Sequence, residues 1–411
     1  MKTEKWTVRD AFKVIFTVLV TMFLSAFSVA ETNAFSSAPD HVILFIIDGL
    51  SYKVWDRMDL PVLGKMAGEG TLVEKMYLPP AAHPKTGVYA TLHSSSIPNP
   101  IMMSGTVFID EKTEYIQQKL FPGQITAFVA NTYSYETLNR YYHYSYQRPG
   151  DDAESVHWAL TFMEEGEPAF MRVHLQQAGG AGSMSMNPDS NESWRFDIWH
   201  GESPYRRTVA TADSLLGVLV RGLESSGILS STAIIVLGDH GQNDTGWHPL
   251  QFVDSSITTA VIWGAGVKPG VRVPYAELID VVPTLSALLG CEVPKTSIGR
   301  PIVEALGAYS GPVLPQKRLI SEMLDQFTRY RTSMAEATYL LEQIDSGAKG
   351  ALYSSLERNV RENFYDISTF TLWPRFDSLE ALIENNGVVL ARLDELLVSI
   401  RTEADTTNKR R

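Results

Sequence analysis

Residues 41–48 read His41-Val-Ile-Leu-Phe-Ile-Ile-Asp48, an unbroken apolar run that ends in a carboxylate. Such a run is typical of a strand buried on both faces, as in a parallel sheet covered by helices. Between runs of this type lie amphipathic helical patterns, of which residues 206–224 are the clearest. Strands that alternate with helices predict an α/β fold, a doubly wound and mostly parallel sheet with helices on both faces. The other apolar runs are residues 125–130, 169–175, 233–237 and 259–263.

The first 30 residues have the pattern of an export segment. Basic residues precede the apolar run 14–30, which ends in the small residues Ser28-Val-Ala30. Small residues there are typical of a signal-peptide cleavage site, whereas the length of the run is near the lower limit for a spanning helix. Residues 1–30 are therefore predicted to be a signal peptide or a membrane anchor. Either interpretation predicts an extracytoplasmic protein, periplasmic, secreted or anchored facing outward, with no membrane contact except through an uncleaved N-terminal segment.

Two further regions follow along the chain. Residues 38–310 contain the strand patterns and are predicted to form the α/β domain. After Pro315 the patterns are helical and amphipathic, so residues 311–402 are predicted to form a helical C-terminal region that serves packing or oligomer contacts. Residues 403–411 are expected to be a disordered tail. The helical patterns of this region cover residues 317–344, 351–363 and 378–400.

Composition excludes several classes of function. The chain has 35 Lys and Arg against 47 Asp and Glu, a net charge of −12, which disfavours nucleic acid as a specific partner. A small-molecule phosphate or sulfate ester remains compatible, because a bound metal can supply local positive charge. The single cysteine, Cys291, can form neither an internal disulfide nor a zinc–thiolate cluster. It lies in the apolar run 285–293, which predicts a buried and unreactive thiol.

Acids and histidines collect at the predicted strand ends. Asp48 ends the first strand, Asp239 and His240 follow the run 233–237, and His248 comes eight residues after His240. A lone strand-end Asp often only caps the next helix, so each of these acids has a structural interpretation as well. Two such acids and two histidines at one sheet edge match the ligand set of zinc and related divalent ions. We therefore predict a metal site formed by these four residues, with zinc favoured and calcium or manganese as alternatives.

The motifs around these residues resemble the alkaline phosphatase superfamily, nearest its type I phosphodiesterase/nucleotide pyrophosphatase and sulfatase branches. Residues 42–49 are similar to the family's first strand and its metal-binding Asp, and residues 233–241 to its most recognisable metal motif. Residues 278–290 resemble the "DIxPTLLxLLG" helix, and Gly299-Arg-Pro301 the phrase that follows it. The resemblance implies an alkaline-phosphatase-like fold and two divalent metals. It assigns Asp48, Asp239 and His240 to one metal site and His248 to the other.

The resemblance also implies a nucleophile, and here the sequence departs from the family. Members use a Thr or Ser at a helix N-terminus, or a modified Cys or Ser in sulfatases. The matching segment is Ala81-Ala-His-Pro84-Lys-Thr86, and its alignment puts Ala82, which has no nucleophilic atom, on that position. Thr86 is the nearest hydroxyl and becomes the candidate catalytic residue, although a hydroxyl there can also be an ordinary helix-surface group. A metal-bound water is the alternative nucleophile.

A second departure concerns the family's Asp-x-x-Gly-His pair, which holds the other metal. In the matching stretch, the pair becomes Gln176 and Gly180 in one register, or Gly179 and Ser183 in the other. The loop predicted at residues 183–203 could supply substitute ligands, or could be an ordinary solvated loop. Its candidate ligands are Asp189, Glu192, Asp197, His200 and Glu202.

Two functions are compatible with this pattern. The first is an exported metal-dependent hydrolase of phosphate or sulfate esters, in which Thr86 or a water attacks. The second is a non-catalytic member of the superfamily that acts as a binding or structural module. The residues that separate them are Ala82 and the strand end from Gln176 to Ser183.

Overall fold

The computed structural model describes residue 35 and residues 37–79, 84–96, 113–133, 138–249, 252–310, 317–345 and 347–410. The predicted signal peptide or anchor, residues 1–30, and the aligned nucleophile position, Ala82, lie outside these described residues. Among the described residues, no helix combines the length and apolarity needed to cross a membrane.

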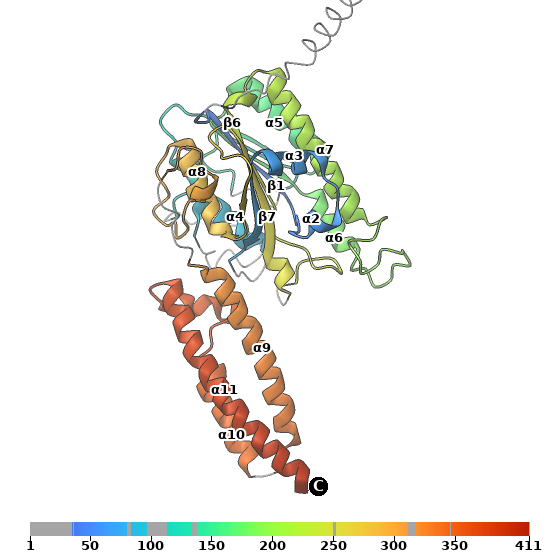
Figure 1. Ribbon diagram of the computed structural model, residues 1–411, viewed down its shortest axis with the longest axis vertical. Coiled ribbons are helices and arrows are strands. Elements are labelled where there is room, and N and C mark those ends of the chain that lie inside the picture. The colour runs from blue at the N-terminus through green and yellow to red at the C-terminus, as the bar shows by residue number, and fades with distance from the viewer. Residues whose placement is uncertain are drawn as a thin grey trace, which may run out of the picture.

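A nine-stranded mixed sheet forms the centre of the α/β domain, with the order β4-β3-β5-β1-β6-β7-β2-β8 and with β9 paired to β2 (Figure 1). Of these strands only β7 runs against the others, since it pairs antiparallel with both β6 and β2. The predicted mostly parallel α/β sheet is thus confirmed. The strands are β1 (His41–Ile47), β2 (Thr71–Tyr77), β3 (Thr126–Ala130), β4 (Tyr144–Gln147), β5 (Phe170–Leu175), β6 (Thr232–Leu237), β7 (Ile257–Gly264), β8 (Val271–Val273) and β9 (Ala276–Glu277).

Strand β1 lies between two parallel partners, β5 and β6, and this explains its unbroken apolar sequence. Ile43, Phe45 and Ile47 belong to the core on one side of the sheet. The alternate residues of the strand belong to the core on the other side. Both sides are covered by helices, so neither set of side chains can be polar without a buried partner.

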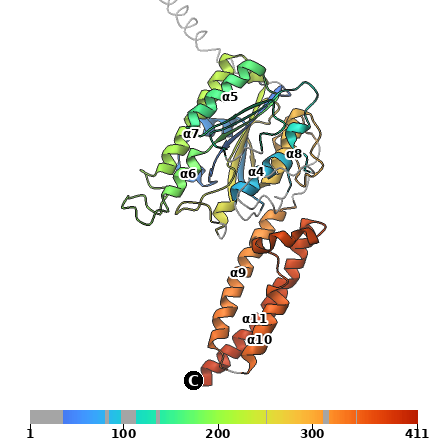
Figure 2. The ribbon, with the colours of Figure 1, turned by 180° about the vertical axis from the view of Figure 1, so that it is seen from behind.

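Helices cover both faces of the sheet (Figures 1 and 2). Helices α3, α5 and α7 pack on one face and α4 and α8 on the other. Helix α7 begins at a local start signal, since Ser203 accepts a hydrogen bond from Tyr205 N and Pro204 lies in the first turn. The helices of this domain are α2 (Val54–Arg57), α3 (Pro61–Glu69), α4 (Pro84–Ser94), α5 (Asp152–Gly166), α6 (Gln177–Met184), α7 (Pro204–Ser225) and α8 (Val281–Leu289).

The C-terminal region forms a helical bundle that extends away from the sheet domain (Figure 1). It consists of α9 (Leu319–Gln343), α10 (Ala348–Leu356) and α11 (Leu379–Arg410) and has a hydrophobic core of its own. Helices α9 and α11 are parallel, because Arg329 pairs with Asp394 and Glu336 pairs with Arg401 farther along both helices. The sequence predicts a disordered tail from residue 403, but α11 continues to Arg410. Ala404 and Thr407 are buried in this last stretch, so the continued helix covers apolar surface.

Candidate metal centre

Three neighbouring parallel strands bring polar side chains to one edge of the sheet. Strand β1 lies between β5 and β6, and Asp48 and Asp239 follow the carboxyl ends of β1 and β6. Side chains at the carboxyl ends of adjacent parallel strands converge at the same edge. Asp48, Asp239 and His240 meet there, and all three are fully buried.

The carboxylate of Asp239 is oriented by backbone hydrogen bonds. Its Oδ1 accepts from Gly49 N at 2.9 Å and from His240 N at 3.0 Å. Its Oδ2 is buried and has no hydrogen-bond partner among the described residues. Gly49 has a φ of 70°, a conformation that favours glycine, and this turn brings its N–H to Asp239. One oxygen of Asp239 is thus fixed by the backbone, while the other faces the cluster.

The imidazole of His240 presents a lone pair to the two acids. Its Nδ1 lies 2.8 Å from the carbonyl oxygen of Gly241. A carbonyl only accepts, so Nδ1 carries the proton and Nε2 has the lone pair in the neutral ring. Nε2 lies 3.4 Å from Asp48 Oδ1 and 3.8 Å from Asp239 Oδ2. With the ring in this form, three acceptor atoms face one another, an arrangement that suits a bound cation.

A divalent metal fits this arrangement. One ligand atom from each of Asp48, Asp239 and His240 lies within 4.8 Å of the other two. Metal bonds of about 2.0–2.2 Å in a tetrahedral site separate neighbouring ligand atoms by roughly 3.4 Å, close to the spacing found here. Two carboxylates balance the charge of one dication, and a dication bound here would act as a Lewis acid. Carboxylate and imidazole ligands suit zinc, with manganese as an alternative.

His248 lies beside this group rather than within it. Its ring centroid is 4.2 Å from that of His240, with the two rings tilted, and it stacks on the Trp247 ring at 4.1 Å. The ligand atoms that converge are those of Asp48, Asp239 and His240 alone, as far as the described residues go. The role of His248 as a metal ligand therefore stays a prediction, and the ring of His248 packs against that of His240.

The strand end that aligns with the family's second ligand pair points at Asp48 instead. Gln176 donates a hydrogen bond from Nε2 to Asp48 Oδ2 at 2.6 Å. Gly179 approaches Asp48 so closely that a Cβ there would overlap with Asp48 Oδ1. An Asp at position 179 would therefore not fit this backbone. Neither register supplies an additional carboxylate or imidazole at this point.

The loop predicted at residues 183–203 begins later than expected, because Ser183 and Met184 still belong to α6. It packs against the loop that follows β6, with Ile198 N donating to Asp244 O at 3.0 Å. The side chains of Asp197, His200 and Glu202 accept hydrogen bonds inside the loop, as between Glu202 N and His200 Nδ1 at 3.2 Å. None of them joins the ligand group among the described residues. The structure gives no support to the substitute-ligand hypothesis for this loop.

Helix α4 begins at Pro84, as expected for a proline in a first helical turn. It follows β2, which ends at the same sheet edge as β1 because β7 alone is reversed. Thr86 belongs to this first turn, but its side chain lies outside the described residues. Its catalytic role stays a prediction.

The sequence interpretation missed Lys53. Its Nζ lies 2.9 Å from Asp244 Oδ1 and 2.7 Å from Asp254 Oδ2, and it joins the turn after β1 to the loop that carries His248. Burial lowers the pKa of Lys53, but the hydrogen bonds to the two acids outweigh it and raise the pKa overall. A lysine five residues after a strand-end acid has no distinctive pattern, so only the fold reveals this contact.

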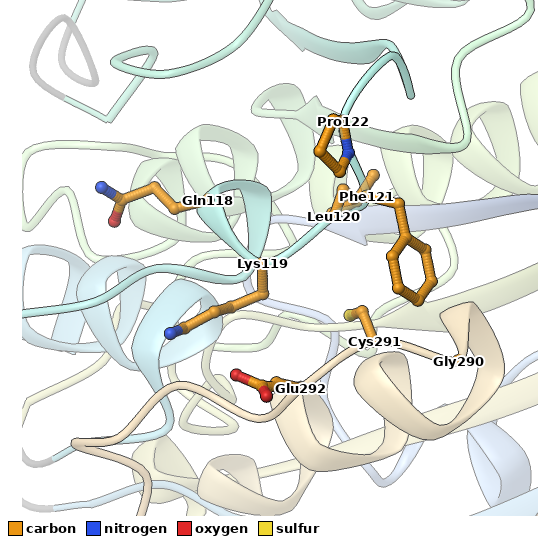
Figure 3. Close-up of a pocket in the computed structure, with 8 residues that line it drawn as sticks. All are labelled: Gln118, Lys119, Leu120, Phe121, Pro122, Gly290, Cys291 and Glu292. Carbon is orange, nitrogen blue, oxygen red and sulfur yellow. The ribbon is translucent and has the colours of Figure 1, made fainter.

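A surface hollow of about 530 Å³ lies elsewhere, between the end of α8 and residues 118–122 (Figure 3). Cys291 lines it and is partly exposed, so the prediction of a buried thiol was wrong. Burial nonetheless raises the pKa of this thiol, which keeps it protonated and unreactive at neutral pH. None of the predicted metal ligands lines this hollow.

Comparison with known proteins agrees with the fold and the motifs. The Sulfatase family model matches residues 87–291. The chain is 26% identical over 184 residues to GPI ethanolamine phosphate transferase 2 of Candida glabrata, covering 37% of this chain and 22% of that protein. It is 27% identical over 111 residues to arylsulfatase K of Xenopus laevis, covering 26% and 21%. The chain thus spans about a fifth of the length of these curated relatives.

A solved structure has the same fold. The lipoteichoic acid synthase LtaP from Listeria monocytogenes superposes with a TM-score of 0.53, at 14% identity, over 66% of this chain and 78% of that one. The sheet, the ordered motifs and the family model together place this chain in the alkaline phosphatase superfamily. Residues 87–291 are the part of the chain that resembles the Sulfatase family.

Proposed function

We propose that the protein is an exported metal-dependent hydrolase of small phosphate or sulfate esters. The observation that carries this proposal is the convergence of one ligand atom each from Asp48, Asp239 and His240 within 4.8 Å. Relatives at about 26–27% identity include a GPI ethanolamine phosphate transferase and an arylsulfatase. The first name refers to a phosphate ester and the second to a sulfate ester. Zinc is the favoured ion.

The residues of the centre have separate roles in this proposal. Asp48, Asp239 and His240 would hold the ion, which would polarise the ester and offset its negative charge. The ring of His248 packs against the ring of His240 at a tilt and would help to orient it. Either Thr86 or a water supplies the attacking oxygen. Burial of the carboxylates excludes bulk water around them and strengthens their interaction with the ion.

Metal content and ester hydrolysis test the proposal together. Purified protein is expected to retain a divalent ion and to hydrolyse at least one member of a panel of chromogenic phosphate and sulfate esters. Asp239→Asn should lose both properties, whereas Asp197→Asn should keep both, since Asp197 is an exposed acid outside the cluster. Thr86→Ala separates the two nucleophiles. It should abolish hydrolysis and spare metal binding if Thr86 attacks, and should leave the rate unchanged if a water does.

The non-catalytic alternative rests on a specific observation as well. Ala82 occupies the aligned nucleophile position, and Gln176 bonds to Asp48 where the family has a metal ligand. In that case the protein would bind the ion but hydrolyse no ester in the panel. This outcome would replace the hydrolase by a binding module built on the same fold.

The proposed location outside the cytoplasm has its own test. Cell fractionation should find the protein outside the cytoplasm, and N-terminal sequencing should show whether the chain begins after about residue 30. A cytoplasmic protein with an intact N-terminus would overturn this part of the proposal.

A further inference from the structure

Strand β5 carries an arginine and a histidine in the middle of the fold. Arg172 and His174 are both fully buried, and they alternate with apolar residues that belong to the opposite core. They therefore face the side of the sheet covered by α4. A buried guanidinium costs several kcal/mol unless its surroundings compensate for its lost hydration. The contacts of the Arg172 guanidinium therefore indicate its role.

The surroundings of Arg172 fix the guanidinium in place. Its planar group lies 5.5 Å from the Tyr89 ring and 5.1 Å from the Phe128 ring. Its Nη1 lies 3.4 Å from both ring nitrogens of His93. His93 is neutral, because burial holds its pKa well below the usual range. Two aromatic rings and a neutral imidazole thus pack around this guanidinium, and its Nη2 points toward His174.

The contact with His174 decides which ring nitrogen carries the proton. Arg172 Nη2 lies 3.0 Å from His174 Nδ1. A guanidinium can only donate, so Nδ1 must accept, and the proton of the ring lies on Nε2. Nε2 lies 3.8 Å from Asp48 Oδ2 and 3.9 Å from Asp239 Oδ2. His174 therefore presents an N–H to the two carboxylates, the opposite of the lone pair that His240 presents.

Gln176 adds a second N–H on the same side. A carboxylate only accepts, so the 2.6 Å contact with Asp48 Oδ2 comes from the amide nitrogen of Gln176. Oδ2 of Asp48 thus faces two donors, while Oδ1 faces His240 at 3.4 Å. The carboxylate pair has one side with lone pairs that suits a cation, and another side with N–H groups that repels one.

We propose that Arg172, acting through His174, is a positioning residue that makes this centre mononuclear, with the N–H groups of His174 and Gln176 standing where a second cation would otherwise bind. The proposal rests on the metal centre proposed above, since it concerns the number of ions held there.

The tautomer of His174 gives a direct test in the unmodified protein. Long-range ¹⁵N–¹H spectra of protein labelled with ¹⁵N-histidine and stripped of metal distinguish the two tautomers. The signal of His174 is identified by its loss in His174→Gln. The expected result is a neutral ring with the proton on Nε2, whereas His240 should have it on Nδ1. A proton on Nδ1 of His174, or on both nitrogens, would overturn the proposal.

Zinc titration tests the stoichiometry, counting only the equivalents that survive a competing chelator. The unmodified protein and Gln176→Asp should each bind one equivalent, because Arg172 still directs the N–H of His174 at the site. The double variant Arg172→Met/Gln176→Asp should bind two, since His174 can then turn a lone pair inward beside a new carboxylate. Simple loss of packing would not add a site. Two equivalents in the unmodified protein, or one in a folded double variant, would contradict the proposal.

The two experiments separate this inference from the proposed function. If the unmodified protein binds no zinc, the metal centre itself fails, whatever the tautomer of His174. If it binds one equivalent but His174 has its proton on Nδ1, the metal centre stands and the role of Arg172 fails. Should the double variant not fold, the tautomer and the stoichiometry of the unmodified protein still decide.

Discussion

Asp239 illustrates how one side chain serves both the fold and the site. Its Oδ1 accepts two backbone hydrogen bonds, from Gly49 and His240, while its Oδ2 lies in the buried cluster. The neighbouring carboxylate of Asp48 is also fully buried. Two buried carboxylates repel each other in the absence of a cation, so this pair should lower the stability of the metal-free fold, as expected for the proposed metal site.

Asp239→Asn should therefore have opposite effects on binding and on stability. The amide oxygen keeps the two backbone hydrogen bonds, while the loss of one charge removes the repulsion from Asp48. Without metal, we expect the free energy of unfolding to rise by about 1–2 kcal/mol, as measured by urea unfolding in the presence of a chelator. Zinc affinity should fall by at least about 100-fold. Asp197→Asn is the control and should change neither quantity, and a destabilised Asp239→Asn protein would argue against the repulsion.

Asp280 predicts a pH dependence of stability. Burial raises its pKa to about 7, against hydrogen bonds from Arg300 N and Glu277 N that lower it. Between the unfolded pKa of 3.8 and the folded value of about 7, the folded state binds more protons than the unfolded state. Stability from this group is therefore fully present at low pH and is lost as the pH rises through about 7.

We expect the free energy of unfolding of the metal-free protein to decrease between about pH 4 and about pH 7, with Asp280 contributing on the order of 2–4 kcal/mol. Asp280→Asn should flatten this profile, because an amide does not titrate. Urea unfolding at several pH values measures the slope, and Asp197→Asn should leave it as it is. Parallel profiles for the unmodified protein and Asp280→Asn would refute the assignment.

At the scale of elements, the loop after β6 is held to the turn after β1 by Lys53. Asp244 and Asp254 flank His248 in this loop, and Asp244 also accepts from Trp199 Nε1 at 2.8 Å. The lysine is only 21% exposed, so its two ion pairs are less screened than surface pairs. This single side chain thus joins three segments around the centre.

Lys53→Met should loosen this loop without unfolding the domain. We expect a loss of about 1–3 kcal/mol in stability, because two half-buried carboxylates lose their partner. Hydrogen exchange should become faster in residues 241–256 and remain unchanged in β1 and β6. Lys65→Met is the matched control. Lys65 is 70% exposed and lies 3.9 Å from Glu69, so its removal should cost less than about 0.5 kcal/mol. Equal effects of the two variants would show that Lys53 has no special role.

The elements that could be predicted from the sequence are those with strong local patterns. The apolar run of β1 and the strand-end positions of Asp48 and Asp239 follow from residue order alone. Strand β2 was missed because its second half includes Glu74 and Lys75, which interrupt the apolar pattern at the sheet margin. The sequence of β5 shows that Arg172 and His174 alternate with apolar residues. The reason for these two polar residues, however, depends on contacts with side chains of α4, which lie some 80 residues earlier in the chain.

The whole molecule is a sheet domain with a helical bundle at one edge (Figures 1 and 2). Glu277 ends β9 and accepts hydrogen bonds from Ile320 N at 3.0 Å and from Tyr275. Arg318 lies over the Tyr275 ring at 4.8 Å, and Tyr77 packs against the core of the bundle. Both β2 and β9 are parallel to β1, so the bundle is attached at the sheet edge that carries the candidate metal centre.

The bundle and the candidate metal centre are nevertheless separated along this edge of the sheet. Strands β6 and β7 lie between β1 and β2, and a spacing of about 4.8 Å per strand gives a lateral separation of roughly 14 Å. The candidate metal ligands and both cores of the sheet domain come from residues before 311. A chain that ends after residue 310 should therefore fold and bind zinc with an affinity within about twofold of the full chain. Its hydrolysis of small chromogenic esters, if the full chain has it, should also persist.

Removal of the bundle exposes Tyr77 and Tyr275. This exposure should lower the melting temperature by a few degrees, since each side chain loses burial worth about 1–2 kcal/mol. Zinc titration and thermal unfolding measure the two effects.

Glu277→Gln in the full chain is the companion variant. It weakens the contact between the sheet domain and the bundle without removing the bundle, and it should leave zinc affinity unchanged. If either protein folds but no longer binds zinc, the bundle is part of the centre, and the separation inferred from the strand order is wrong.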